Sequence, residues 1–140
     1  LYPVRFTPQD LDVNLSPRKF RIAMEEILNA EGVPIRQWQR MPTPLDNRFR
    51  LKHGYGKGCP WSCPHASAKG VEYRAQDYPE TLKVLDDYST ISGIWPPNGL
   101  ELMEYYIAAF EKAFENLDAV IELASKIEDQ KFKVPVIYGV

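Results

Sequence analysis

Cysteine and histidine side chains gather near the middle of the chain, where they could hold a metal ion. Cys59, Cys63, His53 and His65 lie close together in the sequence, and thiolate and imidazole are the usual ligands of structural zinc. However, three residues separate the two cysteines, where a zinc knuckle usually has two, and Pro60 stiffens the turn. We therefore expect reduced thiols in a loop and keep a small zinc-binding module as a weaker alternative.

The segment from Gly54 to Gly58 is rich in glycine and could approach a phosphate group. Phosphate-binding loops work because their backbone amides converge at the start of a helix that follows a strand. Here Cys59 and Pro60 follow instead, which argues against nucleotide-binding loops of the Walker and dinucleotide types. Two interpretations stay open: a mobile loop whose Lys57 meets a phosphate, or an ordinary flexible surface loop.

The densest group of polar and aromatic residues comes earlier, around Trp38. Arg36, Gln39 and Arg40 flank this tryptophan. Arginine forks pair with carboxylates and phosphates, and a tryptophan face packs against a sugar ring or a cofactor. We predict that these four residues and Lys57 bind a substrate, although the same residues on an edge strand would also suit a solvated surface. No catalytic residue is expected in this chain, because no nucleophile has a base beside it and no serine lies in an elbow motif.

Length and composition narrow the class of protein. The chain has 140 residues, of which 44% are hydrophobic and 26% are charged, and this balance is typical of one ordinary globular domain. The net charge of −2 argues against nucleic-acid binding as the main activity. No apolar run approaches the roughly 20 residues of a membrane helix. The sparse cysteines do not form a secreted disulfide framework, which favours a cytoplasmic location.

The elements that position these residues follow from hydrophobic periodicity and capping signals. Strands are predicted at residues 1–6, 33–38 and 90–95, and helices at residues 17–30, 79–88 and 99–127. Ser16 and Pro17 mark a helix start, and Gly32 marks a helix stop. The pattern predicts an α+β domain at residues 1–128, with a small, about three-stranded sheet covered by helices on one side. An extended tail is expected at residues 129–140.

The long C-terminal helix carries the clearest periodicity. Its apolar residues alternate by four and three positions and are expected on one seam: Met103, Ile107, Phe110, Phe114, Leu117, Ile121 and Ala124. The seam suits either a coiled-coil dimer or a helix packed across a sheet, and we favour the sheet because the flanking charges are irregular. Phe110 and Phe114 are accordingly predicted to be buried against the sheet.

Four stretches of the sequence, taken in order, resemble the C-terminal part of the DegT–StrS family of aminotransferases: residues 20–34, 36–44, 54–65 and 78–95. The first contains Glu31-Gly32-Val33, which is similar to the family's helix end that leads into a strand. The resemblance implies the small domain of a fold-type-I enzyme that uses pyridoxal phosphate. Such an enzyme transfers an amino group from glutamate or glutamine to a keto-sugar or keto-cyclitol. In several relatives a histidine approaches the substrate where Trp38 stands here, so the resemblance implies packing rather than proton transfer for Trp38.

The same resemblance implies that essential parts lie elsewhere. The family's Schiff-base lysine, its partner for the pyridine nitrogen and its phosphate-binding residues belong to a large domain, which would lie upstream of Leu1. We therefore expect this chain to be part of a longer, homodimeric enzyme and to be inactive alone. A non-catalytic binding or scaffold domain, using the helix seam or the basic loop, is the alternative.

Overall fold

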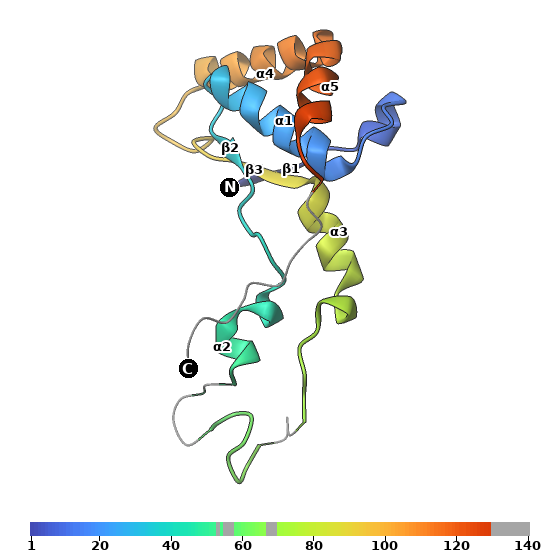
Figure 1. The fold of residues 1–140 in the computed structure, drawn as a ribbon. Coiled ribbons are helices and arrows are strands. Elements are labelled where there is room, and N and C mark those ends of the chain that lie inside the picture. Colours follow the sequence, from blue (N-terminus) through green and yellow to red (C-terminus); the bar gives the residue numbers. More distant parts are fainter. Residues whose placement is uncertain (53, 55–57, 67–69, 130–140) are drawn as a thin grey trace. The chain divides into compact units, whose positions relative to one another are not determined.

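The structure is a computed structural model that describes residues 1–52, 54, 58–66 and 70–129. The described chain forms two compact units. The first comprises Leu1–Trp38 and the described residues from Val84 onward, and the second is built from Gln39–Lys83. The chain is α+β, with a small three-stranded sheet and helices (Figure 1), so the predicted fold class is confirmed.

The first unit is built on an antiparallel sheet with the strand order β1-β3-β2. Strand β1 spans Tyr2–Arg5, β2 spans Ile35–Arg36 and β3 spans Tyr88–Ile91. Helices α1, α4 and α5 lie on one side of this sheet (Figure 1). The core fills the space between the two layers, and its buried members include Phe6, Phe20, Met24, Leu28, Val33, Ile35, Ile91 and Val120.

Helix α1 spans Pro17–Ala30, as the sequence predicts. At its start the hydroxyl of Ser16 accepts a hydrogen bond from the amide of Lys19, which is an N-cap. At its end Gly32 has a φ of 88°, and the Val33 amide donates to the Leu28 carbonyl at 2.9 Å. These features form a Schellman motif, which requires a residue in the left-handed region. Glycine therefore ends the helix and turns the chain into β2.

Helix α3 spans Pro79–Asp87, and β3 follows it at once from Tyr88. The predicted strand at residues 90–95 is therefore wrong in its second half. Gly93 has a φ of 75°, which interrupts an extended backbone soon after Ile91. Strand β2 is also shorter than the predicted residues 33–38, because only Ile35 and Arg36 pair with β3.

The predicted helix at residues 99–127 is two helices. Helix α4 spans Leu100–Glu115 and α5 spans Leu117–Lys126. Between them Asn116 has a φ of −108° and a ψ of 40°, and its side-chain amide donates to the Lys112 carbonyl at 2.8 Å. An asparagine side chain that bonds to nearby backbone competes with helix continuation, so the chain turns there.

The buried face of α4 is not the predicted seam. Tyr106, Ala109 and Ala113 are buried, whereas Phe110 is half-buried and Phe114 is 42% exposed. The prediction that Phe114 is buried is wrong, and Phe110 is only partly covered. The fully buried residues of α4 are Tyr106 and two alanines, whereas Phe110 is only partly covered against the core and Ile107 and Phe114 stay at the surface.

The second unit contains mostly turns. It includes α2 at Asn47–Arg50 and 3₁₀ helices at Thr43–Leu45 and Ala75–Asp77, while another 3₁₀ helix, Pro8–Leu11, lies in the first unit. Leu45 is buried within the second unit. In the described parts of both units, no helix is long and apolar enough to cross a bilayer.

Candidate functional site

The candidate site in the first unit is the end of β2, where Arg36 and Trp38 are both exposed. Trp38 exposes 58% of its surface, although a tryptophan usually hides most of its large apolar area. Strand β2 ends at Arg36, and Trp38 follows at a bend. Exposure still alternates along this segment, because Ile35 is buried and Gln37 is half-buried while Arg36 and Trp38 are exposed. Residues 36–38 therefore present a guanidinium and a flat indole ring to solvent.

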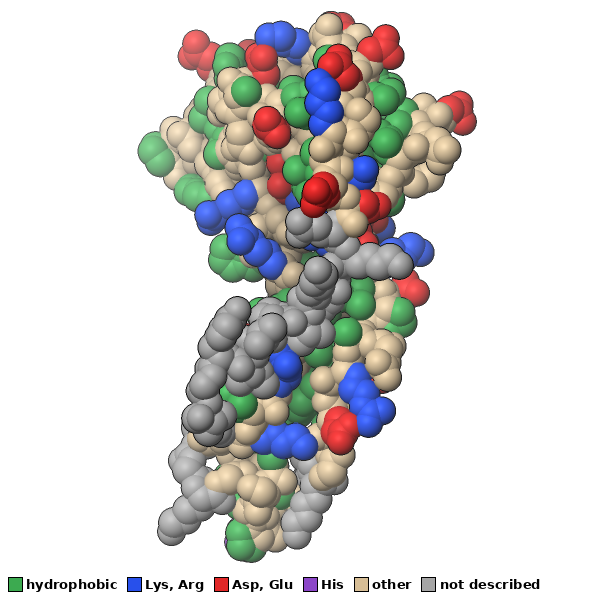
Figure 2. Space-filling model, viewed as in Figure 1, with side chains coloured by type: hydrophobic (Ala, Val, Ile, Leu, Met, Phe, Trp, Pro, Cys, Tyr) green, Lys and Arg blue, Asp and Glu red, His purple; other side chains and the backbone are tan. Residues whose placement is uncertain are grey.

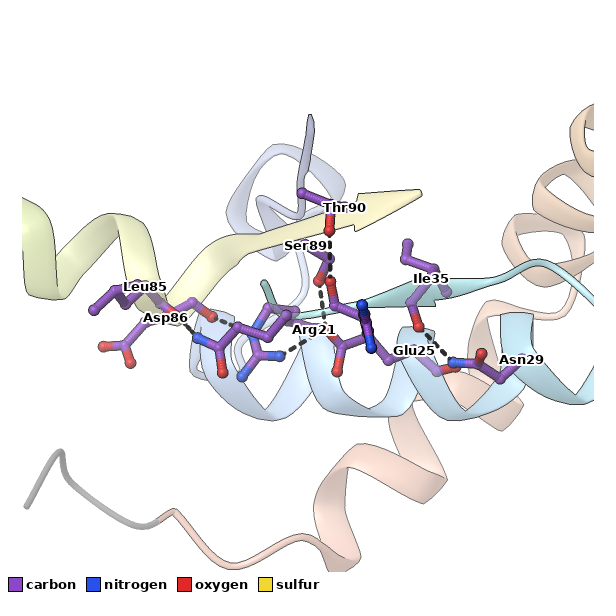
Figure 3. A network of polar contacts seen from close by, with 10 residues as sticks. Arg21, Glu25, Asn29, Ile35, Leu85, Asp86, Ser89 and Thr90 are labelled. Carbon is purple, nitrogen blue, oxygen red and sulfur yellow. Dashed lines mark hydrogen bonds and ion pairs between the residues drawn. The ribbon is translucent and has the colours of Figure 1, made fainter. Parts of the chain in front are cut away.

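Three side-chain hydrogen bonds fix the end of β2. Two of them reach carbonyl groups of the strand, and the third runs from Gln37 to a carbonyl group of α3. The Thr90 hydroxyl donates to the Arg36 carbonyl at 3.1 Å. The Asn29 amide donates to the Ile35 carbonyl at 2.7 Å, as Figure 3 shows. Gln37 donates its own amide to the Leu85 carbonyl at 2.6 Å. The strand is thus fixed from β3, from α1 and from α3, which positions the two exposed side chains.

A buried charge network lies beside these bonds (Figure 3). The guanidinium of Arg21 donates to the Glu25 carboxylate at 2.8 Å and to the Asp86 carbonyl at 3.1 Å. The Ser89 hydroxyl donates to the same Glu25 oxygen at 2.5 Å. Arg21 is only 3% exposed, and a charge so buried needs such partners to be tolerated. The network ties α1 to the junction where α3 becomes β3.

Two aspartates at this junction have different surroundings. Burial raises the pKa of Asp86, and the negative charges of Asp129 and Asp87 act in the same direction, against Arg18 and Arg21. Asp87 is buried and accepts a hydrogen bond from Arg5 Nε at 2.9 Å. Hydrogen bonding to Asp87 raises the pKa of Arg5. Asp86 and Asp87 therefore contribute to the contacts where α3 meets β3, and their surroundings do not indicate acid–base catalysis.

The other predicted binding residues belong to the second unit or lie outside the described residues. Gln39 donates its amide to the Met41 carbonyl at 2.9 Å and to the Thr43 hydroxyl at 2.8 Å, so it holds its own turn. Arg40 is exposed. Lys57 lies outside the described residues. Within the first unit, the predicted set therefore reduces to Arg36 and Trp38.

The two cysteines are joined in a disulfide, Cys59–Cys63. The expectation of reduced thiols is wrong, and sulfur atoms bonded to each other cannot serve as zinc thiolates, so the zinc alternative fails. Gly58 opens this turn with a φ of 75°, and a Cβ there would meet the Ser62 hydroxyl at 1.9 Å. No group of three or more histidine, cysteine, aspartate or glutamate residues within the described residues could hold a metal ion.

Three aromatic residues brace the loop that contains the disulfide. The Trp61 indole donates to the Tyr73 hydroxyl at 3.0 Å, and Phe49 meets both rings edge-on, with ring centres 6.1 and 6.0 Å apart. Edge-on aromatic pairs of this kind add to the energy of simple burial. The turn at residues 58–63 is therefore closed by the disulfide and packed through Trp61, whereas most of the glycine-rich segment, residues 55–57, lies outside the described residues.

Sequence reasoning missed the network and the aromatic cluster. Arg21 and Glu25 stand at i and i+4 on the amphipathic helix α1. Oppositely charged residues at this spacing can pair, and such a pair beside buried positions could have indicated a buried ion pair. By contrast, Phe49, Trp61 and Tyr73 have no sequence spacing that announces their contact. Comparison with models of protein families and with curated proteins gives no match for this chain.

Proposed function

We propose that this chain is the small domain of a DegT–StrS-type aminotransferase and that Arg36 and Trp38 contact the acceptor substrate. In this proposal the acceptor is a keto-sugar or keto-cyclitol, the amino donor is glutamate or glutamine, and the enzyme is a homodimer. The observation that carries the proposal is the pairing of the exposed guanidinium of Arg36, on β2, with the exposed indole of Trp38, two residues further on, in a segment that is hydrogen-bonded to α1, β3 and α3.

The chemistry of these two side chains suits a polyhydroxylated or phosphorylated ring. A guanidinium offers forked donors to phosphate or hydroxyl oxygens, and an indole face packs on the apolar face of a sugar. Arg36 makes no ion pair with any residue that the structure describes. Its charge is therefore available to a ligand. Because the strand is fixed in advance, little order has to be gained on binding.

Pyridoxal phosphate does not fit the residues that the structure describes in this chain. A Schiff-base lysine is usually held in a protected pocket that lowers its pKa, whereas none of the lysines that the structure describes is buried. Lys112 and Lys126 are engaged in surface ion pairs with Glu31 and Glu122. In the proposed enzyme the cofactor is therefore held by another domain, and the role of this chain is to shape the acceptor side of the pocket.

Kinetics of the intact enzyme test the proposal, with the two half-reactions measured separately. We expect Trp38→Ala to weaken acceptor binding and to leave the reaction with the amino donor unchanged. Arg36→Gln should lower kcat/KM for the acceptor by about 1.5–3 kcal/mol, the scale of a hydrogen bond to a charged group. Arg36→Lys should recover only part of this loss, because a point charge cannot replace the fork.

Trp95→Ala is the matched control, because Trp95 is 49% exposed in the same unit but is not part of β2 or of the proposed site. It should leave both half-reactions intact. If Trp38→Ala slowed the donor and acceptor half-reactions equally, the strand would be supporting the domain rather than selecting the acceptor. If the coding sequence upstream of Leu1 lacked a lysine-bearing domain, the aminotransferase assignment itself would be wrong.

A further inference from the structure

An apolar groove of about 760 Å³ runs along α4 in the first unit. One wall is the exposed seam of α4, with Met103, Ile107, Phe110 and Phe114, and the other includes Tyr2 and Ile91 of the sheet. Ile107 is 58% exposed and Phe114 is 42% exposed. Apolar side chains gathered in this way on a surface mark an interaction site more often than scattered ones do.

The shape of the groove matches a helix. The four seam residues follow one another by four, three and four positions, which is the spacing of a coiled-coil stripe. From Met103 to Phe114 the stripe is about 17 Å long at 1.5 Å per residue. A partner helix of about three turns would therefore cover the stripe from end to end.

The two flanks of this stripe differ in character. On one flank Tyr106, Ala109 and Ala113 are buried in the core of the unit. On the other flank stand three exposed carboxylates, each directly after a seam residue: Glu104, Glu111 and Glu115. Successive helical residues are rotated by about 100°, so these three side chains share one flank. Acidic side chains gather over α4 and α5 in the view of Figure 2.

No positive charge of the helix itself offsets these carboxylates. Lys112 is the basic residue of α4, and its ammonium group donates to both carboxylate oxygens of Glu31 at 2.8 and 2.9 Å. Among the described residues, Glu104, Glu111 and Glu115 form no ion pair. The open flank of the groove is therefore negatively charged and selects against an acidic occupant.

Two candidate occupants are disfavoured by what the structure describes. Helices α1 and α5 of the first unit already bury their apolar faces in its core, and α3 carries more acidic than basic residues. A second copy that paired its α4 antiparallel to this one would bring the two acidic flanks together, and facing like charges repel. The negative charge of the open flank therefore favours an occupant with basic side chains.

We propose that the α4 groove binds a basic amphipathic helix of another protein, with an apolar stripe on the seam and lysine or arginine beside Glu104, Glu111 and Glu115. The binding mode is a helix laid in a groove, in which apolar anchors supply affinity and the charged flank supplies selection. This site is separate from the strand end that carries Arg36 and Trp38 and does not depend on the proposed enzymatic function.

Two synthetic peptides of roughly 21 residues, or three heptads, test the proposal against the 140-residue chain. Both carry leucine and isoleucine on the stripe. One has lysine on the flanks and the other has glutamate at the same positions. Fluorescence anisotropy should show that the lysine peptide binds about tenfold or more tightly, with a preference that weakens as salt is added. Ile107→Ser with Phe114→Ser should abolish binding of the lysine peptide. Leu11→Ser, at an exposed leucine outside the groove, should not affect it.

Charge reversal distinguishes charge-selective binding of the peptide from non-specific hydrophobic binding. The triple variant Glu104→Lys, Glu111→Lys and Glu115→Lys changes exposed side chains only, and it should prefer the glutamate peptide. Equal binding of both peptides by the unaltered chain, or an unchanged preference in the triple variant, would overturn the proposal. So would light scattering that shows a dimer which Ile107→Ser converts to a monomer, because a second copy would then occupy the groove.

Discussion

The side-chain amide of Gln37 donates a 2.6 Å hydrogen bond to the main-chain carbonyl of Leu85, and this bond joins the end of β2 to the last turn of α3. The last carbonyl groups of a helix have no partner within the helix itself. Gln37 satisfies one of them, and Arg21 satisfies the next, at Asp86. The end of α3 is therefore bonded to the side chains that also fix the candidate site.

Removal of the Gln37 amide should destabilise the chain. We expect Gln37→Ala to lower the free energy of unfolding by about 1–2 kcal/mol, because the Leu85 carbonyl loses its partner at a partly buried position. Urea unfolding measures this directly. Gln9→Ala is the control, since the Gln9 amide makes a longer, 3.3 Å bond to Leu15 at an exposed site. Equal losses in the two variants would mean that water replaces Gln37 without cost.

The two phenylalanines of the α4 seam should differ in their contribution to stability. Phe110 is half-buried against the core, so Phe110→Ala should cost about 2–4 kcal/mol, somewhat below a fully buried ring. Phe114 is 42% exposed, and Phe114→Ala should cost less than about 1 kcal/mol. Thermal and urea unfolding of both variants test the difference. A large loss for Phe114→Ala would indicate that this ring is covered in solution.

The buried arginine should matter more than an exposed one. Arg21→Ala leaves the Glu25 carboxylate without its partner in a site where its side chain is only 18% exposed. We expect a loss of about 2–4 kcal/mol, slightly below the range for fully buried pairs. Arg74→Ala, which removes an exposed ion pair with Glu72, should change stability much less, because water screens an exposed pair. Similar values for the two would show that water reaches the Arg21 network.

Asp86 should make stability depend on pH in the direction set by its raised pKa. A carboxyl group whose pKa is higher in the folded chain favours folding in its protonated form. This contribution is present below the ordinary pKa of about 4 and is lost as pH rises through the folded value. Asp86→Asn should therefore be more stable than the unaltered chain at about pH 7, and the difference should shrink towards about pH 3.

Glu122 provides the opposite case for the same titration. A hydrogen bond from Lys126 lowers the pKa of Glu122, so its favourable contribution is present above the ordinary pKa and is lost in acid. Glu122→Gln should accordingly be slightly less stable near neutral pH, with a difference that also vanishes in acid. If both variants changed stability in the same direction at neutral pH, the assigned causes would be wrong.

Local signals in the sequence were sufficient for α1. Ser16, Pro17 and Gly32 specify its ends through hydrogen bonds and backbone angles that involve only neighbouring residues. The end of β3 and the break at Asn116 were not predictable in the same way. Several neighbouring residues have similar local propensities to end each element. Strand pairing and packing on the core, which involve distant residues, determine where the element ends.

In the candidate site too, some features follow from local sequence and others depend on distant residues. Arg36 and Trp38 stand out by residue type and by their alternation with Ile35 and Gln37, so the sequence identified them. The bonds that hold them come from Thr90 and Leu85, far along the chain, and no spacing reveals such partners. The covered flank of α4 was likewise missed, because alanines contribute little to a hydrophobic pattern but allow close helix packing.

Strand β1 has a consequence for the order in which the chain folds during synthesis. Arg5 and its partner Asp87 are 82 residues apart, so β1 leaves the ribosome long before β3 exists to pair with it. At about 5–20 residues per second, the delay lasts on the order of several seconds. Throughout that interval Val4 and Phe6, which later contribute to the core, are without their final neighbours. Strand β2 also pairs only with β3, so the whole sheet waits for the last of its three strands, and β1 waits longest.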